Sequence, residues 1–328
     1  MKKYDVVSIC NALVDILVSA KEEDIATLEL TKGMMHLVDE KRQAQVLSFF
    51  AGAETTTELG GSALNAIRTI ASLGLKTSFS GMVGEDSYGS LIKERMKDLG
   101  IEAKLATGKD ATGTCLILVT PDGERTMNTN LGASRLYDES LVAKEVLESA
   151  EIFHFCGYQW DTPEQIKTIE KACAIAKNAG VKISFDVADP FVIGRHKDVF
   201  LDLIANQADI VFANREEARM LFDCDPEGAA AKIAETGAIA VVKKGGEGCV
   251  VAQGGEQHQI APVKTEVVDT TAAGDMFAAG FLYGLSRGKS LPVCGNLGAL
   301  LASDVISRTG ASVSQKALLE AKGVFERG

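Results

Sequence analysis

The amino-acid sequence predicts an α/β protein in which helices cover both faces of a mostly parallel central sheet. Two observations support this prediction. Short runs of β-branched and apolar residues alternate with segments of helical periodicity along most of the 328 residues. Several helical segments also end at a glycine, as at Gly74 and Gly100, the residue that most often terminates a helix. Strands separated by helices pair in parallel through crossovers, so the expected architecture is a three-layer α/β/α sandwich.

The elements of this sandwich follow from local patterns in the order of the chain. Each strand is a short run dominated by apolar and β-branched residues, and each helix repeats its apolar residues with a period near 3.6. The strands are expected at 4–10, 76–83, 152–156, 181–186, 210–213, 238–243 and 249–252. The helices are expected at 61–73, 88–99, 163–178, 199–205, 215–222, 228–235, 274–285 and 293–307.

Two stretches break this alternation and predict a small β-sheet lid. Residues 12–18 and the stretch around Leu37–Val38 look extended, with no helix between each run and its partner. Residues 112–129 contain two extended runs around Pro121-Asp122-Gly123, which has the composition of a hairpin turn. A helix at 39–50 interrupts the lid. We therefore expect one domain over residues 1–328 with a discontinuous lid from about 12–58 and 112–130.

Composition and charge limit the classes of function. A formal charge of −11 and a pI near 5.0, with no basic block, argue against a nucleic-acid or membrane-surface binder. No apolar stretch approaches the ~18 residues that suggest a membrane span. The chain enters a strand-like run at Tyr4, which leaves no room for a signal peptide. Seven cysteines without a CxxC pair are typical of reduced core residues, so we expect a cytoplasmic protein.

The segment from Asp269 to Asp275 is the strongest functional signal. It runs into an apolar helix, and the small residues Ala272, Ala273 and Gly274 would leave backbone N–H groups open at the helix start. Unpaired donors and the helix dipole attract an anion there. Asp275 lies within reach of that anion, and an anion cradle beside a general base suits phosphoryl transfer to an alcohol. The alternative is a helix N-cap followed by close packing of a small-residue helix.

Two further groups of residues are candidates for holding a polyol. Gly60 and Gly61 precede a helix and let a ligand approach the backbone, and Asn65 presents an amide one turn later. Asn11 and Asp15 follow the first strand, where an amide and a carboxylate suit vicinal hydroxyls. The structural alternatives are a tight turn with helix capping for the first group and a strand-end turn for the second.

Two later segments suit a nucleotide. Asn214 and Glu217 follow a strand, at the sheet edge where ligands of open α/β proteins gather; they would organise waters around Mg²⁺ or form a helix capping box. Lys244-Gly245-Gly246-Glu247-Gly248 ends the next strand in a glycine-rich turn, which a simple hairpin explains equally well. The sequence has neither a Walker A motif nor the HRD and DFG motifs of protein kinases, which excludes those two ATP-binding designs.

The segments 58–65 and 269–275 resemble the two signatures of the ribokinase (PfkB) family of carbohydrate and nucleoside kinases. The resemblance runs from about residue 4 to 311 and is nearest to the adenosine kinase branch, whose pattern the run Thr112-Gly113-Thr114-Cys115 also matches. It implies a ribokinase-like fold, with Asp275 as the catalytic base and the Ala272–Gly274 backbone as an anion hole. The family usually has glycine where this chain has Ala272.

The resemblance also implies roles for residues whose own signals are weak. Arg125, in the lid hairpin, would lie near the transferring phosphoryl group. The sugar would be held by Asn11, Asp15, Gly60, Gly61 and Asn65. The nucleotide site would include Asn214, Lys244, Gly245, Gly248, Thr270 and Asn296, with Glu217 reaching Mg²⁺ through water. The apolar residues Leu37, Met127, Leu131 and Phe191 would enclose a purine, or would only pack the lid against the body.

The resulting expectation is an ATP-dependent kinase of a ribose primary hydroxyl, most directly one that converts adenosine to AMP. Its cofactors would be ATP and Mg²⁺, with a monovalent cation as a further candidate. One alternative is a kinase of a free sugar, such as ribose or fructose, or of another nucleoside. Another, of a different class, is a catalytically weak nucleoside- or sugar-binding regulatory homologue. We expect no nucleic-acid or membrane partner, and either a monomer or a homodimer joined through the lid.

The alanine at position 272 raises a specific question about the anion hole. An added methyl is harmless where φ is below zero, but costs about 1 kcal/mol or more where left-handed geometry is required. Because backbone N–H groups would hold the anion, we expect activity to survive the substitution.

Overall fold

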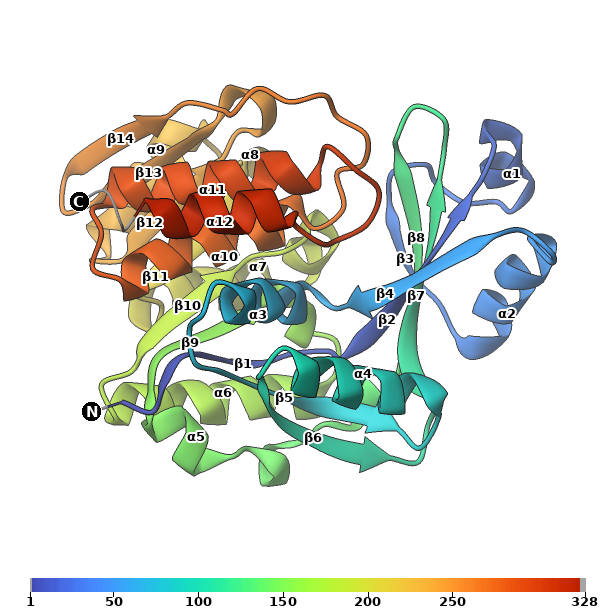
Figure 1. Cartoon of the computed structure of the whole chain (residues 1–328). Coiled ribbons are helices and arrows are strands. Elements are labelled where there is room, and N and C mark those ends of the chain that lie inside the picture. The colour runs from blue at the N-terminus through green and yellow to red at the C-terminus, as the bar shows by residue number, and fades with distance from the viewer. Residues whose placement is uncertain (1, 325–328) are drawn as a thin grey trace.

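The computed structural model describes residues 2–324 and places a nine-stranded sheet at the centre of that part of the chain (Figure 1). The sheet order is β14-β13-β12-β11-β10-β9-β1-β5-β6. Neighbours from β12 to β6 pair in parallel, and β13 and β14 add an antiparallel edge. The strands are β1 (Tyr4–Ile9), β5 (Thr77–Gly84), β6 (Glu102–Gly108), β9 (Ala150–Cys156), β10 (Lys182–Asp186), β11 (Ile210–Asn214), β12 (Ile239–Lys243), β13 (Cys249–Gln253) and β14 (Glu256–Ile260).

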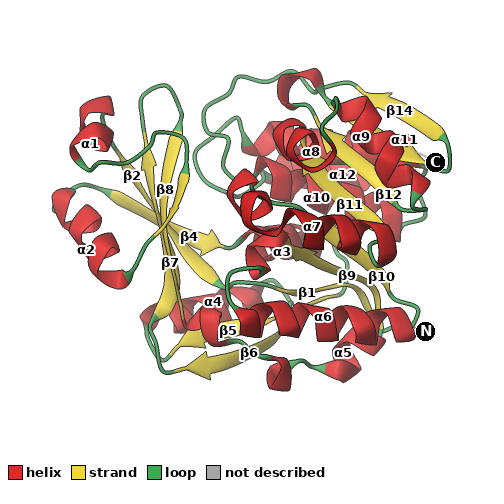
Figure 2. Cartoon of the chain, turned by 180° about the vertical axis from the view of Figure 1, so that it is seen from behind, coloured by secondary structure: helices red, strands yellow, loops and turns green. Residues whose placement is uncertain are grey.

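Two layers of helices cover this sheet, one facing the viewer in Figure 1 and the other in Figure 2. Each layer packs on its own cluster of buried residues. The first layer holds α3 (Ser62–Ser72), α4 (Ser87–Asp98), α10 (Ala273–Ser286), α11 (Leu291–Val305) and α12 (Gln315–Gly323). The second holds α5 (Lys144–Glu148), α6 (Pro163–Asn178), α7 (Pro190–Asn206), α8 (Arg215–Phe222) and α9 (Pro226–Glu235). The predicted three-layer α/β/α sandwich is confirmed.

A second sheet of five strands stands beside the body, and we call it, with α1 and α2, the lid (Figure 1). Its order is β3-β8-β7-β2-β4, and β7 and β8 form the predicted hairpin. One lid face packs under α1 and α2 through residues such as Ile16 and Leu118, whereas Leu17, Cys115 and Ile117 lie on the other face. The lid elements are β2 (Leu13–Ser19), α1 (Glu22–Thr27), β3 (Met35–Leu37), α2 (Glu40–Phe49), β4 (Thr55–Gly60), β7 (Thr112–Val119) and β8 (Arg125–Gly132).

Short connections join the lid to the body. Between β1 and β2 only residues 10–12 pass from one sheet to the other. Gly61 connects β4 to α3 with φ 99°, and a side-chain carbon there would lie 2.3 Å from the carbonyl oxygen of Asn11. Gly132 ends β8 with φ 47°, and its missing side chain leaves room for the carbonyl of Ala111. Glycine is required at both crossings because any side chain would strike the neighbouring backbone.

The structure corrects the predicted length of one helix. The helix expected at 199–205 is the second half of α7, which begins at Pro190 after the N-cap Asp189 and bends at His196. The backbone of His196 (φ −134°, ψ 24°) is not helical, so periodicity is interrupted there and only the later half was evident.

The structure also bears on the cysteines and on the question of membrane-spanning helices. Six of the seven cysteines are buried, with Cys224 partly exposed, which confirms their prediction as core residues. Among the helices of residues 2–324, none combines the length and the apolar character needed to cross a bilayer.

Candidate active site

A cavity of about 670 Å³ lies between the lid and the carboxyl ends of the body strands. It brings together most of the predicted site residues, although they come from distant parts of the chain. Those that line it are Asn11, Asp15, Leu37, Gly61, Asn65, Arg125, Met127, Phe191, Asn214, Glu217, Gly245, Gly248, Thr270, Ala272, Ala273, Gly274 and Asp275. Ligands of open α/β sheets are expected at this edge.

The loop before α10 is held by the buried carboxylate of Asp269. One of its oxygens accepts a hydrogen bond from the Thr271 backbone N–H at 2.8 Å, and the other accepts from the Gly310 N–H at 2.9 Å. Ala272 precedes the helix in the left-handed conformation (φ 56°, ψ 14°), so the condition under which its methyl carries a cost is met. The α10 N-terminus lines the cavity through Ala273 and Gly274. The Ala273 N–H donates to the Thr270 carbonyl at 3.3 Å, and the helix dipole with the remaining N–H groups of the first turn would attract an anion.

Asp275, in the first turn of α10, is fixed by two residues of α3. Ser62 Oγ donates to its Oδ1 at 2.7 Å, and Asn65 Nδ2 donates to its Oδ2 at 2.9 Å. Burial raises the pKa of Asp275, while these two hydrogen bonds act to lower it. Ser62 was missed in the sequence, because the signature drew attention to the glycines and Asn65. The arrangement leaves Asn65 Oδ1 buried without a partner among the described residues, so it is available to a hydroxyl donor in the cavity.

Asn11 lies within the crossing from β1 to β2, and Asp15 lies in β2 just after it. Asn11 Oδ1 accepts a hydrogen bond from Gln165 Nε2 of α6 at 2.9 Å, which leaves its amide group as a donor toward the cavity. Asp15 packs against Gly60, where a side-chain carbon would lie 2.1 Å from Oδ1; Gly60 therefore serves the site by leaving this space. Burial raises the pKa of Asp15 to about 7, opposed by Arg68.

Arg125 extends from the lid strand β8 to the loop below the anion hole. Its Nε lies 2.9 Å from Asp269 Oδ1, and its Nη2 donates to Thr270 Oγ1 at 3.1 Å. The Asp269 side chain is wholly buried and that of Arg125 is 14% exposed, so this ion pair is a clamp between lid and body.

The predicted nucleotide residues Asn214 and Glu217 lie at the end of β11 and in α8. They form the predicted capping box: Asn214 Oδ1 accepts from the Glu217 N–H at 2.9 Å, and Glu217 Oε2 accepts from the Asn214 N–H at 2.7 Å. Burial raises the pKa of Glu217 to about 7, although the Lys243 ammonium opposes the shift. Both residues also line the cavity, so capping and ligand binding are compatible.

Two predicted nucleotide residues lie elsewhere. Lys244 Nζ is bound by Glu227 at 2.9 Å and Gln259 at 2.8 Å, outside the cavity lining, whereas its neighbour Lys243 lines the cavity. Asn296 is exposed on α11, and the same helix contributes Ala299 and Ser303 to the cavity instead. The lid residues Leu37, Met127 and Leu131 and the body residue Phe191 do meet in the cavity, with the Arg195 guanidinium 4.5 Å above the Phe191 ring.

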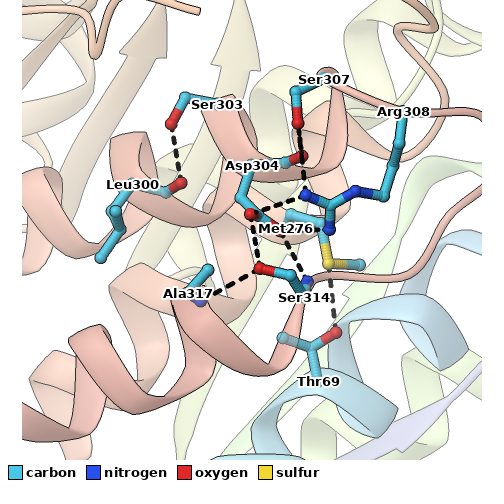
Figure 3. A network of polar contacts seen from close by, with 9 residues as sticks. All are labelled: Thr69, Met276, Leu300, Ser303, Asp304, Ser307, Arg308, Ser314 and Ala317. Atoms are coloured by element: carbon cyan, nitrogen blue, oxygen red, sulfur yellow. Dashed lines mark hydrogen bonds and ion pairs between the residues drawn. The ribbon is translucent and has the colours of Figure 1, made fainter.

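Figure 3 shows a network of polar contacts around Asp304 of α11. The carboxylate of Asp304 accepts from the Ser314 N–H at 2.6 Å and from Arg308 Nη1 at 2.8 Å, and so joins the end of α11 to the start of α12. Hydrogen bonds from Ser314 and the Arg308 charge lower the pKa of Asp304, outweighing the effect of burial. The loop between them carries Gly310, which binds Asp269, and Ala311, whose N–H donates to Glu58 of β4 at 2.9 Å.

Comparison with known proteins identifies the family. Residues 29–318 match the family described as pfkB family carbohydrate kinase. The chain belongs to this family. PfkB-family membership makes it a sugar or nucleoside kinase, a phosphotransferase with a hydroxyl acceptor, and agrees with the expectation drawn from the two signatures.

Three similar proteins include both sugar kinases and an adenosine kinase. A probable sugar kinase from Rhizobium etli CFN 42 superposes with a TM-score of 0.93 at 36% identity, covering 99% of both chains. The adenosine kinase of Sinorhizobium meliloti superposes with a TM-score of 0.92 at 34% identity, covering 98% of this chain and 99% of its own. The 5-dehydro-2-deoxygluconokinase of Shouchella clausii is 28% identical, covering 83% of this chain and 87% of its own length.

Proposed function

We propose that this PfkB-family kinase phosphorylates the primary hydroxyl of a ribose-containing nucleoside, with ATP as the phosphate donor. Adenosine is the first candidate for this nucleoside. The observation that carries the proposal is the division of the cavity into polar and apolar parts. Asn65 bonds the Asp275 carboxylate, and Asn11 and Asp15 line the same cavity. The lid adds an apolar cluster to the lining, which includes Cys115, Ile117 and Met127. A nucleoside has the same division, because its ribose carries the hydroxyls and its base presents two flat faces.

The apolar part is contributed by both lid and body. Leu37 and Met127 come from the lid, and Phe191 from the body, with its side chain 46% exposed. Aromatic and aliphatic side chains suit the faces of a purine. A free sugar carries hydroxyls around its whole ring and would leave this region without a matching surface. Similarity to the adenosine kinase of Sinorhizobium meliloti supports the same choice.

The proposed reaction is a direct transfer between the two substrates. Asp275 takes the proton from the ribose primary hydroxyl, whose oxygen forms a new bond to the γ-phosphorus of ATP. The bond from that phosphorus to the bridging oxygen breaks, and its electron pair leaves with ADP. The backbone N–H groups at Ala272–Gly274 and the guanidinium of Arg125 would stabilise the charge on the transferred group. Closure of the lid excludes water, which would otherwise accept the phosphoryl group.

Other residues of the cavity are proposed to bind the nucleotide and the metal ion. Gly245, Gly248 and Thr270 line it and would border the phosphates of ATP. Both oxygens of Glu217 already accept hydrogen bonds from Asn214, so this carboxylate fits contact with Mg²⁺ through water. Among residues 2–324 no group of three His, Cys, Asp or Glu side chains converges as a metal cage, which fits an ion held mostly by phosphates and water. When bound, Mg²⁺ would neutralise phosphate charge.

A sugar kinase is the second candidate, favoured by the similarity to 5-dehydro-2-deoxygluconokinase. A panel of adenosine, other nucleosides, ribose, fructose and 5-dehydro-2-deoxygluconate, each with ATP and Mg²⁺, separates the candidates by the rate of ADP release. We expect turnover with adenosine and formation of AMP. Turnover confined to free sugars would support the second candidate, and saturable nucleoside binding without turnover would indicate a regulatory homologue. Asp275→Asn serves as the control that abolishes transfer while nucleoside binding persists.

A further inference from the structure

Lys243, the last residue of β12, places an ammonium group in the cavity, and no role proposed above uses it. Its side chain is 15% exposed and lines the cavity, while the next residue, Lys244, binds Glu227 and Gln259 on the other side of the strand. Lys243 ends the strand and Lys244 begins the turn that follows, so the two side chains leave the backbone in different directions, and only that of Lys243 lines the cavity.

The ammonium group of Lys243 lies against the start of α10. A side-chain carbon built on Gly274 would lie 3.1 Å from Lys243 Nζ, so the glycine leaves the space that the ammonium occupies. Nζ also lies 3.3 Å from Asp186 Oδ2. Burial alone would lower the pKa of Lys243, but the carboxylates of Asp186, Glu217 and Asp275 outweigh that effect and raise it. The side chain therefore keeps its charge at neutral pH.

The other two cations of the cavity have different partners from Lys243. Among the described residues, the cavity lining contains three Lys or Arg side chains: Arg125, Arg195 and Lys243. Arg125 is paired with Asp269 and Thr270, and Arg195 lies over the Phe191 ring. Lys243 alone of these three lies at Gly274, beside the backbone that would hold the transferred group.

We propose that Lys243 is a catalytic residue that contacts the γ-phosphoryl group of the donor and balances its negative charge during transfer. The inference rests on the proposed kinase function and adds a second cation, besides Arg125, at its phosphate end. Phosphoryl transfer spreads charge over three equatorial oxygens, and an ammonium group offers three N–H donors to such oxygens. Lys243 keeps its proton throughout: the acceptor proton goes to Asp275, and the electron pair of the broken P–O bond leaves with the nucleoside diphosphate.

Neighbouring lysines provide a matched pair for the test. In the full-length protein, Lys243→Met is expected to lower kcat by about 100- to 1000-fold, the usual effect of losing one donor to a developing charge. The acceptor Kd, measured by calorimetry without ATP, is expected to stay within about threefold, because Lys243 does not touch the sugar side. Lys244→Met is expected to leave both values nearly unchanged. Near-normal kcat in Lys243→Met would overturn the proposal.

A second variant separates catalysis from charge balance. Lys243→Met leaves the buried Asp186 without its cation, which destabilises a folded protein whatever the role in catalysis. The double variant Asp186→Asn/Lys243→Met removes that unpaired charge. We expect it to recover the thermal stability but to remain slow. Recovery of the wild-type rate as well would show that Lys243 serves only to neutralise Asp186.

Binding of a non-transferable donor tests the contact independently of the acceptor. We expect Lys243→Met to raise the Kd of AMP-PNP by about tenfold or more, as for a lost hydrogen bond to a charged group. The Kd of ADP is expected to rise much less, because ADP has no γ-phosphate. If the wild-type protein turns over no acceptor but this loss is observed, the proposed function fails and the Lys243 contact stands. If adenosine is phosphorylated and AMP-PNP binding is unaffected, the kinase assignment stands and the Lys243 contact fails.

Discussion

Ala272 holds a backbone conformation that glycine adopts at little cost. Its φ of 56° lies in the left-handed region, where a Cβ atom is strained. We expect Ala272→Gly to raise the free energy of unfolding by about 1 kcal/mol, measured by urea denaturation, because relief of strain exceeds the added freedom of the unfolded chain. Ala273→Gly is the control: Ala273 is helical, so its replacement is expected to lower stability. Equal losses in both variants would contradict the strain at position 272.

Ser62 tunes the carboxylate that acts as base in the proposed reaction. Its hydroxyl donates to Asp275 Oδ1, and this hydrogen bond lowers the pKa of a group that burial raises. Ser62→Ala removes the opposing effect, so the pKa of Asp275 is expected to rise further. Because the base acts only when deprotonated, the acid limb of kcat/KM is then expected to move to higher pH.

A pH profile of kcat/KM with adenosine measures this shift. Ser72→Ala is a matched control on the same helix, since the Ser72 hydroxyl donates to the Arg68 carbonyl and does not contact Asp275. The control is expected to keep the wild-type profile. An acid limb that stays in place or moves to lower pH in Ser62→Ala would show that Ser62 does not act on the base.

Predicted site residues lie together in the structure where a sequence motif fixes both their position and their direction. Asp275, Asn65 and Gly61 meet in one cavity because two short signatures place them at helix starts. Lys244, predicted in the nucleotide site, lies outside the cavity, whereas its neighbour Lys243 lines it. Which of two neighbouring lysines at a strand end faces a cavity depends on the elements packed around that end, and the sequence does not show them.

At the scale of elements, Asp304 joins α11 to α12 and so supports the loop beneath the site. Its pKa is lowered by the bonds it accepts, so the stabilisation is present above the unfolded pKa of about 3.9 and is lost as pH falls through the lower folded value. Asp304→Asn is expected to lower the free energy of unfolding by about 1–2 kcal/mol at pH 7. The difference from wild type, measured by urea denaturation, is expected to shrink at pH 3. A constant difference at both pH values would exclude the charge as its cause.

Buried elements were predictable from the sequence, and half-exposed ones were not. Strands β9 to β12 are covered on both faces, so they appear as apolar runs. β4 begins with three exposed threonines and β6 with Glu102, and their pairing depends on neighbours distant in the chain. Asn296 illustrates a related limit on helices: Ala299 and Ser303 follow it along α11 and reach the cavity, and this offset depends on how α11 packs.

For the whole molecule, the clamp between Arg125 and Asp269 ties the lid to the loop that carries the predicted anion hole. The same guanidinium that would face the transferred group ties β8 to the loop before α10. The hairpin tip is also close to that loop, since a side-chain carbon on Gly123 would lie 2.5 Å from the carbonyl of Val268. Lid position and phosphate-site geometry are therefore set by the same contacts.

The crossing between β1 and β2 has a consequence for how long a bound nucleoside stays. Asn11 is tied to the body through Gln165, whereas Asp15 lies in a lid strand against Gly60. In the proposed function, a ribose bound to both Asn11 and Asp15 links the body to the lid across residues 10–12. The ribose then stays bound for as long as the lid stays closed on the body, so product release follows directly from lid opening. A substitution at Ala12 that loosens this crossing would shorten that dwell time without changing a side chain that lines the cavity.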